Sequence, residues 1–271
     1  MPIIRWKPLV LLVSAVPVAL PQAAPAAAEH SAEHSAEHSA APAAHAAPTA
    51  EDDYYRDALG KTGPELKAAL HGIISNSETL SYDQAKDAIK ATDQDPNDPG
   101  SVVLLYSGRP EAAEGDWNRE HVWAKSHGDF GTSPGPGTDV HHLRPTDQQV
   151  NSARGNKDFD TGGSEVDGAP GNFTDDDSWE PRDQVKGDVA RMVLYMAVRY
   201  DGDDAFPDLE PNDEVDNGKQ PFHGRLSVLK QWSAQDPPDE FEQHRNQVIF
   251  EQFQHNRNPF VDHPEWVDEL W

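Results

Sequence analysis

The chain has 271 residues, of which 36% are hydrophobic and 26% are charged, as is typical of a globular domain with polar extensions. Its formal net charge of −26 excludes a protein that binds nucleic acid through a generally basic surface. Because the sequence has no cysteine, it also excludes disulfides, a thiolate nucleophile and a cysteine-ligated zinc site.

The N-terminus has the pattern of a signal peptide. Arg5 and Lys7 form a short basic region, residues 8–20 are an apolar run, and residues 24–28 offer small-residue cleavage sites. A membrane anchor is the alternative, but the apolar run is shorter than the ~20 residues that a span requires. We therefore expect residues 1–28 to be removed on export. The mature protein is expected outside the cell, or alternatively in the periplasm, and not on a membrane.

A low-complexity stretch follows at residues 29–50, beginning with the repeat "EHSAEHSAEHSA". Its histidines, His30, His34 and His38, could bind a metal, but nothing nearby would fix their geometry. We predict a disordered linker rich in Ala, His and Pro. A globular domain is expected from residue 51 to residue 271.

Within this domain, hydrophobic spacing predicts several helices and a strand. Residues 63–74 and 81–93 have amphipathic patterns, the second with Ser81 as an N-terminal cap. Residues 186–200 are so densely apolar that a buried helix is expected. The remaining elements expected are a strand at 101–109, helices at 224–235 and 239–256, and a short final helix within 256–271. The pattern predicts a single α+β domain that is mainly helical.

Two acidic stretches, at residues 174–183 and 201–218, raise the question of calcium binding. Neither has the spaced Asp or Asn residues, the glycine and the terminal Glu of a helix-loop-helix calcium loop. We predict solvated loops and keep calcium binding as the alternative.

The segment from residue 117 to residue 157 is the local exception to the acidic composition. It carries five Lys and Arg residues against four Asp and Glu residues. Residues 118–123 predict a strand, the Gly- and Pro-rich residues 128–139 a loop, and residues 140–143 a returning strand. Residues 145–155 predict a short helix that is capped by Thr146 and ends at Gly155.

Glu120 and His121 are adjacent in this segment, and adjacent residues of a strand point to opposite faces. The pair is either incidental or divides two tasks, one residue holding something while the other does chemistry. Phosphodiester hydrolysis fits such a division. A neutral imidazole can take a proton from water, and a hard divalent cation on Glu120 and on the amide oxygen of Asn151 can stabilise charge.

The motifs "NREHVWAKSHG", "TDVHHLRPTDQQVNSARGNKDF" and "NRNPFVDHPEW" together resemble those of the endonuclease I family of secreted bacterial nucleases. That family belongs to the ββα-metal, or His-Me finger, class, and the similarity is greatest to its cysteine-free extracellular ribonuclease branch. The resemblance runs from about residue 54 to residue 271 and implies a catalytic domain built around a ββα-metal motif. It also implies a monomer that acts on nucleic acid as its substrate.

By this resemblance, His121 matches the general base, and Glu120 and Asn151 match the metal ligands. The implied ion is Mg²⁺, with Mn²⁺ or Ca²⁺ as alternatives. The implied activity is a nonspecific endonuclease that hydrolyses DNA, RNA or both and leaves 5′-phosphate ends.

The sequence departs from the family in two ways. Ala124 stands where many members carry proline, and no arginine lies between His121 and Asp139, where some members have one that binds phosphate. Lys125, Arg144 or Arg154 must replace that arginine, and we favour Arg154 as the catalytic residue, with the other two as substrate contacts. His141 and His142 are adjacent on the predicted returning strand, so at most one of them faces the site and a structural role is favoured for each. His142 is the candidate substrate contact.

Two other functions are compatible with parts of the sequence. A non-catalytic acidic protein could keep the nuclease fold and bind metal at a surface, but the intact set of Glu120, His121 and Asn151 disfavours this. A zinc hydrolase could use His121, His127 and His141, but the first two lack the spacing that would put them on one helical face.

Overall fold

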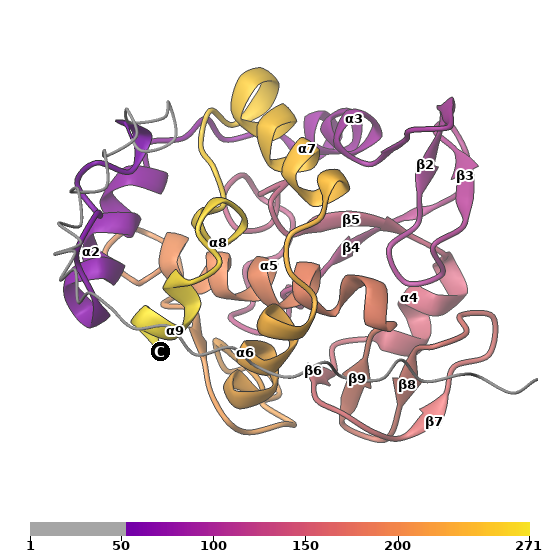
Figure 1. Cartoon of the computed structure of the whole chain (residues 1–271). Helices are drawn as coiled ribbons and strands as arrows, with labels where there is room; N and C mark the ends of the chain where they lie inside the picture. The colour runs from indigo at the N-terminus through magenta and orange to yellow at the C-terminus, as the bar shows by residue number, and fades with distance from the viewer. Residues whose placement is uncertain (1–52) are drawn as a thin grey trace, which may run out of the picture. The chain divides into compact units, whose positions relative to one another are not determined.

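The computed structural model describes residues 53–271 as a mixture of helices and short β-strands (Figure 1). The predicted α+β class is confirmed, and helices account for more of these residues than strands do. Among the described residues, no helix combines the length and apolar character needed to cross a membrane. The signal peptide and the linker predicted for residues 1–50 lie outside the described residues and remain predictions.

The helix α5 (Lys186–Arg199) lies at the centre of the domain, as its apolar sequence predicts. It packs against α2 (Gly63–Ile74), α6 (Leu226–Gln235) and α8 (Pro259–Asp262). The other helices are α3 (Tyr82–Thr92), α4 (Gln148–Arg154), α7 (Glu240–Val248), which continues into a π-helical turn (Ile249–Phe253), and α9 (Trp266–Leu270). Thirteen residues of α5 are buried, so this helix forms the middle of the main hydrophobic core.

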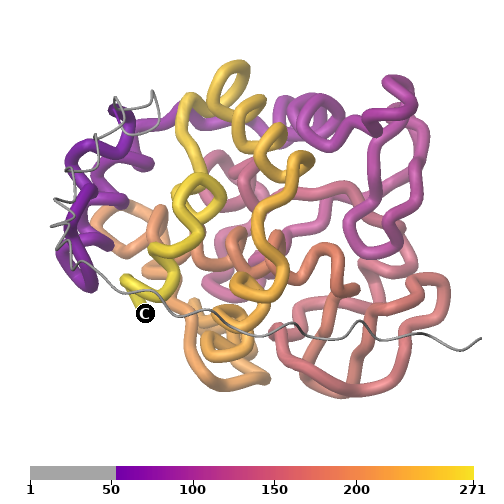
Figure 2. The backbone as a smooth tube through the Cα atoms, in the orientation of Figure 1, coloured from indigo at the N-terminus to yellow at the C-terminus, as the bar shows by residue number. Residues whose placement is uncertain are grey.

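The C-terminal residues pack beside the start of the described chain. Figure 2 shows the last segment running next to α2, and α9 contacts that helix. The hydroxyl of Tyr55 donates a 2.7 Å hydrogen bond to Asp262, and its ring meets that of Trp266 edge-on. The short final helix predicted within residues 256–271 is confirmed as α9, whereas the loop predicted before it contains a further short helix, α8, which His263 and Pro264 separate from α9.

The strands of residues 53–271 form four small sheets. Three strands pair antiparallel in the order β1 (Gln94–Asp95), β2 (Asp98–Val103), β3 (Pro110–Ala112), and two more pair as β4 (Asn118–His121) and β5 (Leu143–Thr146). The third sheet has the order β6 (Asp158–Phe159), β9 (Ser178–Glu180), β8 (Phe173–Thr174), β7 (Ser164–Glu165), and β10 (Glu210–Pro211) pairs parallel with β11 (Phe222–His223). The strands of the last two sheets have two or three residues each, too few to produce a recognisable alternation.

The capping and strand predictions near the N-terminus had different outcomes. Ser81 and Gln84 form the reciprocal capping box that begins α3, which confirms the predicted cap. The strand predicted at 101–109 is wrong in its second half, because β2 ends at Val103. There the chain closes a turn in which Leu104 N donates to Arg109 O at 2.9 Å, and Gly108 takes the positive φ of +67° that the turn requires.

A buried ionic cluster fixes the start of β5 against α3, α5 and α7. Arg144 binds the carboxylates of Asp93 and, at 3.2 Å, Asp188. Arg245 binds Asp93 at 3.3 Å and also donates to the backbone carbonyls of Val140 and, at 2.7 Å, Leu143. We call Asp93, Arg144, Asp188 and Arg245 the ionic core. All four side chains are buried, so each charge depends on the others for compensation.

Candidate active site

The segment with the candidate motif folds as two antiparallel strands followed by a helix. In β4 and β5, Glu120 lies opposite Arg144 and His121 lies opposite Leu143. The helix α4 begins two residues after β5 and packs against β4. The predicted order of strand, loop, strand and helix is therefore observed.

The exact boundaries within this unit differ from the prediction. Residues 140–142 form turns instead of a strand, because Arg245 takes the carbonyls of Val140 and His141, and the strand begins at Leu143. Pro145 and Thr146 belong to β5, so the N-terminal cap of α4 is Asp147, whose side chain makes no capping hydrogen bond. Gly155 ends the helix with a positive φ of +62°, as predicted.

Glu120 and His121 both line one open pocket of about 210 Å³. Its wall includes Arg119, Glu120, His121, Lys125, Asn151 and Arg154. His121 is the last residue of β4, where the regular geometry of the strand ends, so the alternation between two faces need not separate it from Glu120. The two adjacent side chains can consequently serve a single site.

One oxygen of the Glu120 carboxylate is engaged by neighbouring side chains, and the other is available. The carboxylate is 2% exposed, and its Oε1 accepts a 2.7 Å hydrogen bond from Tyr106 and lies 3.3 Å from Nε of Arg154. Within residues 53–271, no hydrogen bond reaches Oε2. Burial raises the pKa of Glu120, while Arg154 and the Tyr106 hydroxyl oppose the shift. A cation bound at Oε2 would favour the ionised form further.

His121 presents one nitrogen as an acceptor. Its Nε2 lies 3.1 Å from the carbonyl oxygen of Gly137, and a carbonyl can only accept, so Nε2 carries the proton. The lone pair is thereby assigned to Nδ1. Burial, together with the neighbouring imidazole of His142, lowers the pKa of His121 to about 3. The imidazole is therefore neutral at ordinary pH and able to accept a proton.

Asn151 supplies an uncommitted amide. It lies on α4, is partly exposed and lines the same pocket as Glu120. Its side chain forms no hydrogen bond with the part of the chain that the structure describes. Asn is a poor residue for a helix interior, because its amide competes for the backbone, so its presence here favours a role for the side chain.

Two cations of the pocket wall have no carboxylate partner among residues 53–271. Lys125 is exposed, as a substrate contact would require. Arg119 donates a 2.7 Å hydrogen bond to the carbonyl oxygen of Tyr82 and lies over that ring, 3.5 Å from its centre. Sequence reasoning missed Arg119 as a site residue. Its position next to Glu120 in a segment of net positive charge is the signal that could have identified it.

Two of the predicted substrate contacts lie elsewhere. Arg144 belongs to the ionic core, where buried carboxylates occupy its guanidinium. His142 is fully buried and lies 2.7 Å from the carbonyl oxygen of Pro136, to which its Nε2 donates. Arg144 and His142 therefore have structural surroundings, and the predicted substrate contacts are corrected. The sequence motif could not show this, because the burial of both residues results from packing against residues outside the motif.

The predicted phosphate-binding role of Arg154 also needs correction. Its side chain is fully buried in the pocket wall, and Nη2 donates a 2.7 Å hydrogen bond to the carbonyl oxygen of Val122. The guanidinium also pairs with Glu120, donates from Nη1 to the carbonyl oxygen of Gly155 at 3.2 Å, contacts His223 and lies 4.9 Å from the centre of the Phe159 ring. Arg154 thus contacts a candidate metal ligand, and not a free surface where phosphate could bind.

The histidines of the zinc hypothesis do not converge. His141 binds Asn256, 3.1 Å away, and packs at a tilt against the ring of Tyr195, whereas His127 lies in a cluster with Asp158 and His223. In the second acidic stretch, Asp201 and Asp203 lie 3.3 and 2.9 Å from the imidazole of His71. Calcium binding by the acidic stretches stays a prediction.

The pocket combines the groups that a hydrolase for anionic substrates needs. These are a neutral imidazole, a carboxylate with one oxygen free, an amide without a hydrogen-bond partner and two cations without a carboxylate partner among residues 53–271. The sequence model of the Endonuclease I family matches residues 62–265. The chain is also 62% identical, over 236 residues, to the extracellular ribonuclease of Bacillus subtilis (strain 168), and 61% identical to that of Bacillus amyloliquefaciens. Each alignment covers 84% of this chain and 82% of the relative. The chain therefore belongs to the endonuclease I family and is a nuclease.

Proposed function

We propose that this protein is a secreted, metal-dependent, nonspecific endonuclease that hydrolyses DNA, RNA or both and leaves 5′-phosphate ends. One observation carries the proposal: the lone pair of His121 and the free oxygens of Glu120 and Asn151 belong to side chains that line one pocket. Family membership supports the reaction class. The names of the two relatives support secretion and activity on RNA.

Glu120 and Asn151 are the proposed ligands of the divalent ion. The donor set fits Mg²⁺, which prefers oxygen ligands and keeps several waters, and Mn²⁺ or Ca²⁺ are alternatives. When bound, the ion would supply charge stabilisation at the phosphate and at the departing oxygen. Tyr106 and Arg154 hold the Glu120 carboxylate from the opposite side, which leaves Oε2 directed to this task.

His121 is the proposed general base, and Arg119 and Lys125 are the proposed phosphate contacts. The Nδ1 atom of His121 takes a proton from water, while Gly137 fixes the ring through Nε2. Arg119 and Lys125 attract the phosphate backbone of the substrate. The alternative of a non-catalytic metal-binding protein is disfavoured by family membership and by the complete set of groups. We propose that the enzyme acts as a monomer and away from the membrane.

The product ends test the proposed chemistry. With Mg²⁺ or Mn²⁺, we expect endonucleolytic cleavage of plasmid DNA or RNA that leaves 5′-phosphate ends, and a chelator should abolish it. Water activated by His121 attacks phosphorus, and Glu120 and Asn151 would hold the ion that supplies charge stabilisation for the departing 3′ oxygen. End-labelling of the products is the measurement. RNA products with 2′,3′-cyclic phosphates would contradict this mechanism, because they require attack by the ribose hydroxyl.

The response to salt should differ from that of a basic nucleic-acid binder. Such proteins lose affinity steadily as salt rises, because binding releases counterions. Here a net charge of −26 should repel the substrate at low ionic strength, over a Debye length of ~30 Å at 0.01 M and ~10 Å at 0.1 M. Added salt should first speed encounter and later weaken the contacts of Arg119 and Lys125.

We therefore expect an optimum of kcat/KM well above the lowest salt concentration. The measurement is a sodium chloride series on duplex DNA at fixed free Mg²⁺. A dinucleotide, whose single phosphodiester carries one negative charge, is the control with little long-range repulsion. A steady fall of kcat/KM from the lowest salt would contradict the repulsion argument and leave acidity as a solubility feature.

A further inference from the structure

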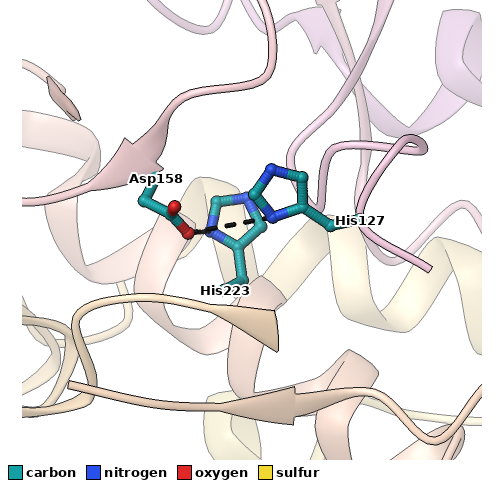
Figure 3. A group of neighbouring side chains, drawn as sticks. All are labelled: His127, Asp158 and His223. Atoms are coloured by element: carbon teal, nitrogen blue, oxygen red, sulfur yellow. Dashed lines mark ion pairs between the residues drawn. The ribbon is translucent and has the colours of Figure 1, made fainter. Parts of the chain in front are cut away.

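A buried cluster of His127, Asp158 and His223 lies behind the pocket and is not used by the proposed chemistry. All three side chains are at most 1% exposed. Figure 3 shows the Asp158 carboxylate directed at both imidazoles, with Oδ1 at 3.2 Å from Nδ1 of His223 and 3.8 Å from Nδ1 of His127. The cluster could hold a metal ion or form part of a chain of polar contacts, and the hydrogen positions decide between these two roles.

The contact between Arg154 and His223 fixes the proton on the His223 ring. Nη2 of Arg154 lies 3.2 Å from Nε2 of His223, and a guanidinium can only donate. Nε2 of His223 must therefore accept, and the proton of the neutral ring is on Nδ1, facing Asp158. Burial lowers the pKa of His223 to about 4, which keeps the ring neutral.

Asp158 is itself held rigidly. Its Oδ1 accepts hydrogen bonds from the backbone N–H of Gly224 at 2.8 Å and from the amide of Asn217 at 3.0 Å, and its Oδ2 accepts another from Asn217 N. Against the effect of burial, His223 and then the two hydrogen bonds from Asn217 lower the pKa of Asp158, so the carboxylate is ionised. A fixed negative charge thus lies behind His223 and favours the tautomer that accepts from Arg154.

The other side of Arg154 reaches the proposed ion site. The guanidinium pairs with Glu120 at 3.3 Å, and Nη2 also binds the carbonyl oxygen of Val122. A continuous path of close polar contacts therefore runs from Asp158 through His223 and Arg154 to Glu120. We propose that Asp158 and His223 are positioning residues that orient Arg154 and, through it, the Glu120 carboxylate; this inference rests on the proposed function of that carboxylate.

A metal ion in the cluster does not fit these contacts. Nδ1 of His127, the ring nitrogen that faces Asp158, lies 2.7 Å from the carbonyl oxygen of Phe222, so this nitrogen carries a proton and offers no lone pair to an ion between the two residues. An ion on Nδ1 of His223 would move the remaining proton to Nε2, where it would point at an N–H of Arg154. Two donors would then face each other in a buried space.

The test compares two matched substitutions, His223→Phe and His127→Phe, by calorimetry with Mn²⁺ and by steady-state kinetics. Both remove a buried imidazole of the cluster, but only His223 contacts Arg154. We expect His223→Phe to weaken Mn²⁺ affinity and lower kcat by about 10–100-fold, as is typical when a group that orients a metal ligand is removed. KM for nucleic acid should change little, because Arg119 and Lys125 remain.

His127→Phe should retain both Mn²⁺ affinity and kcat. His223→Gln can still accept a hydrogen bond from Arg154 and should restore part of the loss.

A double-mutant cycle with Arg154→Lys separates positioning from general destabilisation. Lysine keeps the positive charge but lacks the fork that reaches both Glu120 and His223, so adding His223→Phe to it should cost little more. Equal losses of Mn²⁺ affinity and kcat in His223→Phe and His127→Phe would overturn the inference. So would full additivity of the losses caused by His223→Phe and Arg154→Lys, or a chelator-resistant ion that both histidine variants lose. A crystal structure of His223→Phe gives a readout independent of activity: Arg154 should move away from Glu120, and an unmoved Arg154 would refute positioning. Failure of the unsubstituted enzyme to bind Mn²⁺ would instead refute the proposed function.

Discussion

His121→Ala is expected to lower kcat/KM on nucleic acid by about 10²–10⁴-fold, the usual cost of losing a positioned general base. The ring's Nδ1 is its only assigned acceptor, and the neighbouring imidazole of His142 cannot replace it, since that side chain is fully buried and does not line the pocket. Affinity for Mg²⁺ or Mn²⁺ should stay nearly intact, because Glu120 and Asn151 are the proposed ligands. Steady-state kinetics and calorimetry on the same preparation measure both quantities.

Two comparisons make this result interpretable. His244→Ala removes an exposed imidazole from α7 and should leave kcat/KM unchanged. Asn151→Ala should instead weaken ion binding. If His121→Ala loses the ion while Asn151→Ala keeps it, the proposed roles of these residues are reversed.

Asp93→Ala is expected to have the largest effect on stability. Asp93 is fully buried and compensates both Arg144 and Arg245, so its removal leaves two buried guanidinium groups with Asp188 as the remaining carboxylate of the ionic core. Breaking a buried ion pair in this way typically costs about 3–5 kcal/mol. For a domain of this size, the loss corresponds to a fall in melting temperature of roughly 6–20 °C. Thermal unfolding followed by circular dichroism measures the change.

The control for this prediction is Asp87→Ala. Asp87 lies on the same helix, α3, but its side chain is 74% exposed, and its ion pair with Lys90 is at the surface. Its removal should leave the melting temperature nearly unchanged, because solvent screens such pairs. Equal losses in the two variants would show that α3 is sensitive to any substitution and that the ionic core has no special role.

The fold could be predicted wherever the information is local. The apolar density of residues 186–199 is sufficient for a buried helix, and Ser81 with Gln84 is sufficient for a capping box. The strands β6 to β11 could not be predicted, because each has only two or three residues and depends on tertiary packing. The start of β5 was misplaced for a similar reason, since Arg245, about a hundred residues away in the chain, binds the carbonyls that precede it.

The candidate site shows the same division. The sequence by itself determined the family, the ordered unit of two strands and a helix, and the set of Glu120, His121 and Asn151, because these residues lie within one short segment. Only the tertiary structure decided which basic residues are free. Arg144 and Arg154 are buried against carboxylates, whereas Arg119 and Lys125 line the open pocket without a carboxylate partner among residues 53–271. A guanidinium has the same charge in either setting, and its role depends on partners such as Asp93 and His223 that lie 51 and 69 residues away along the chain.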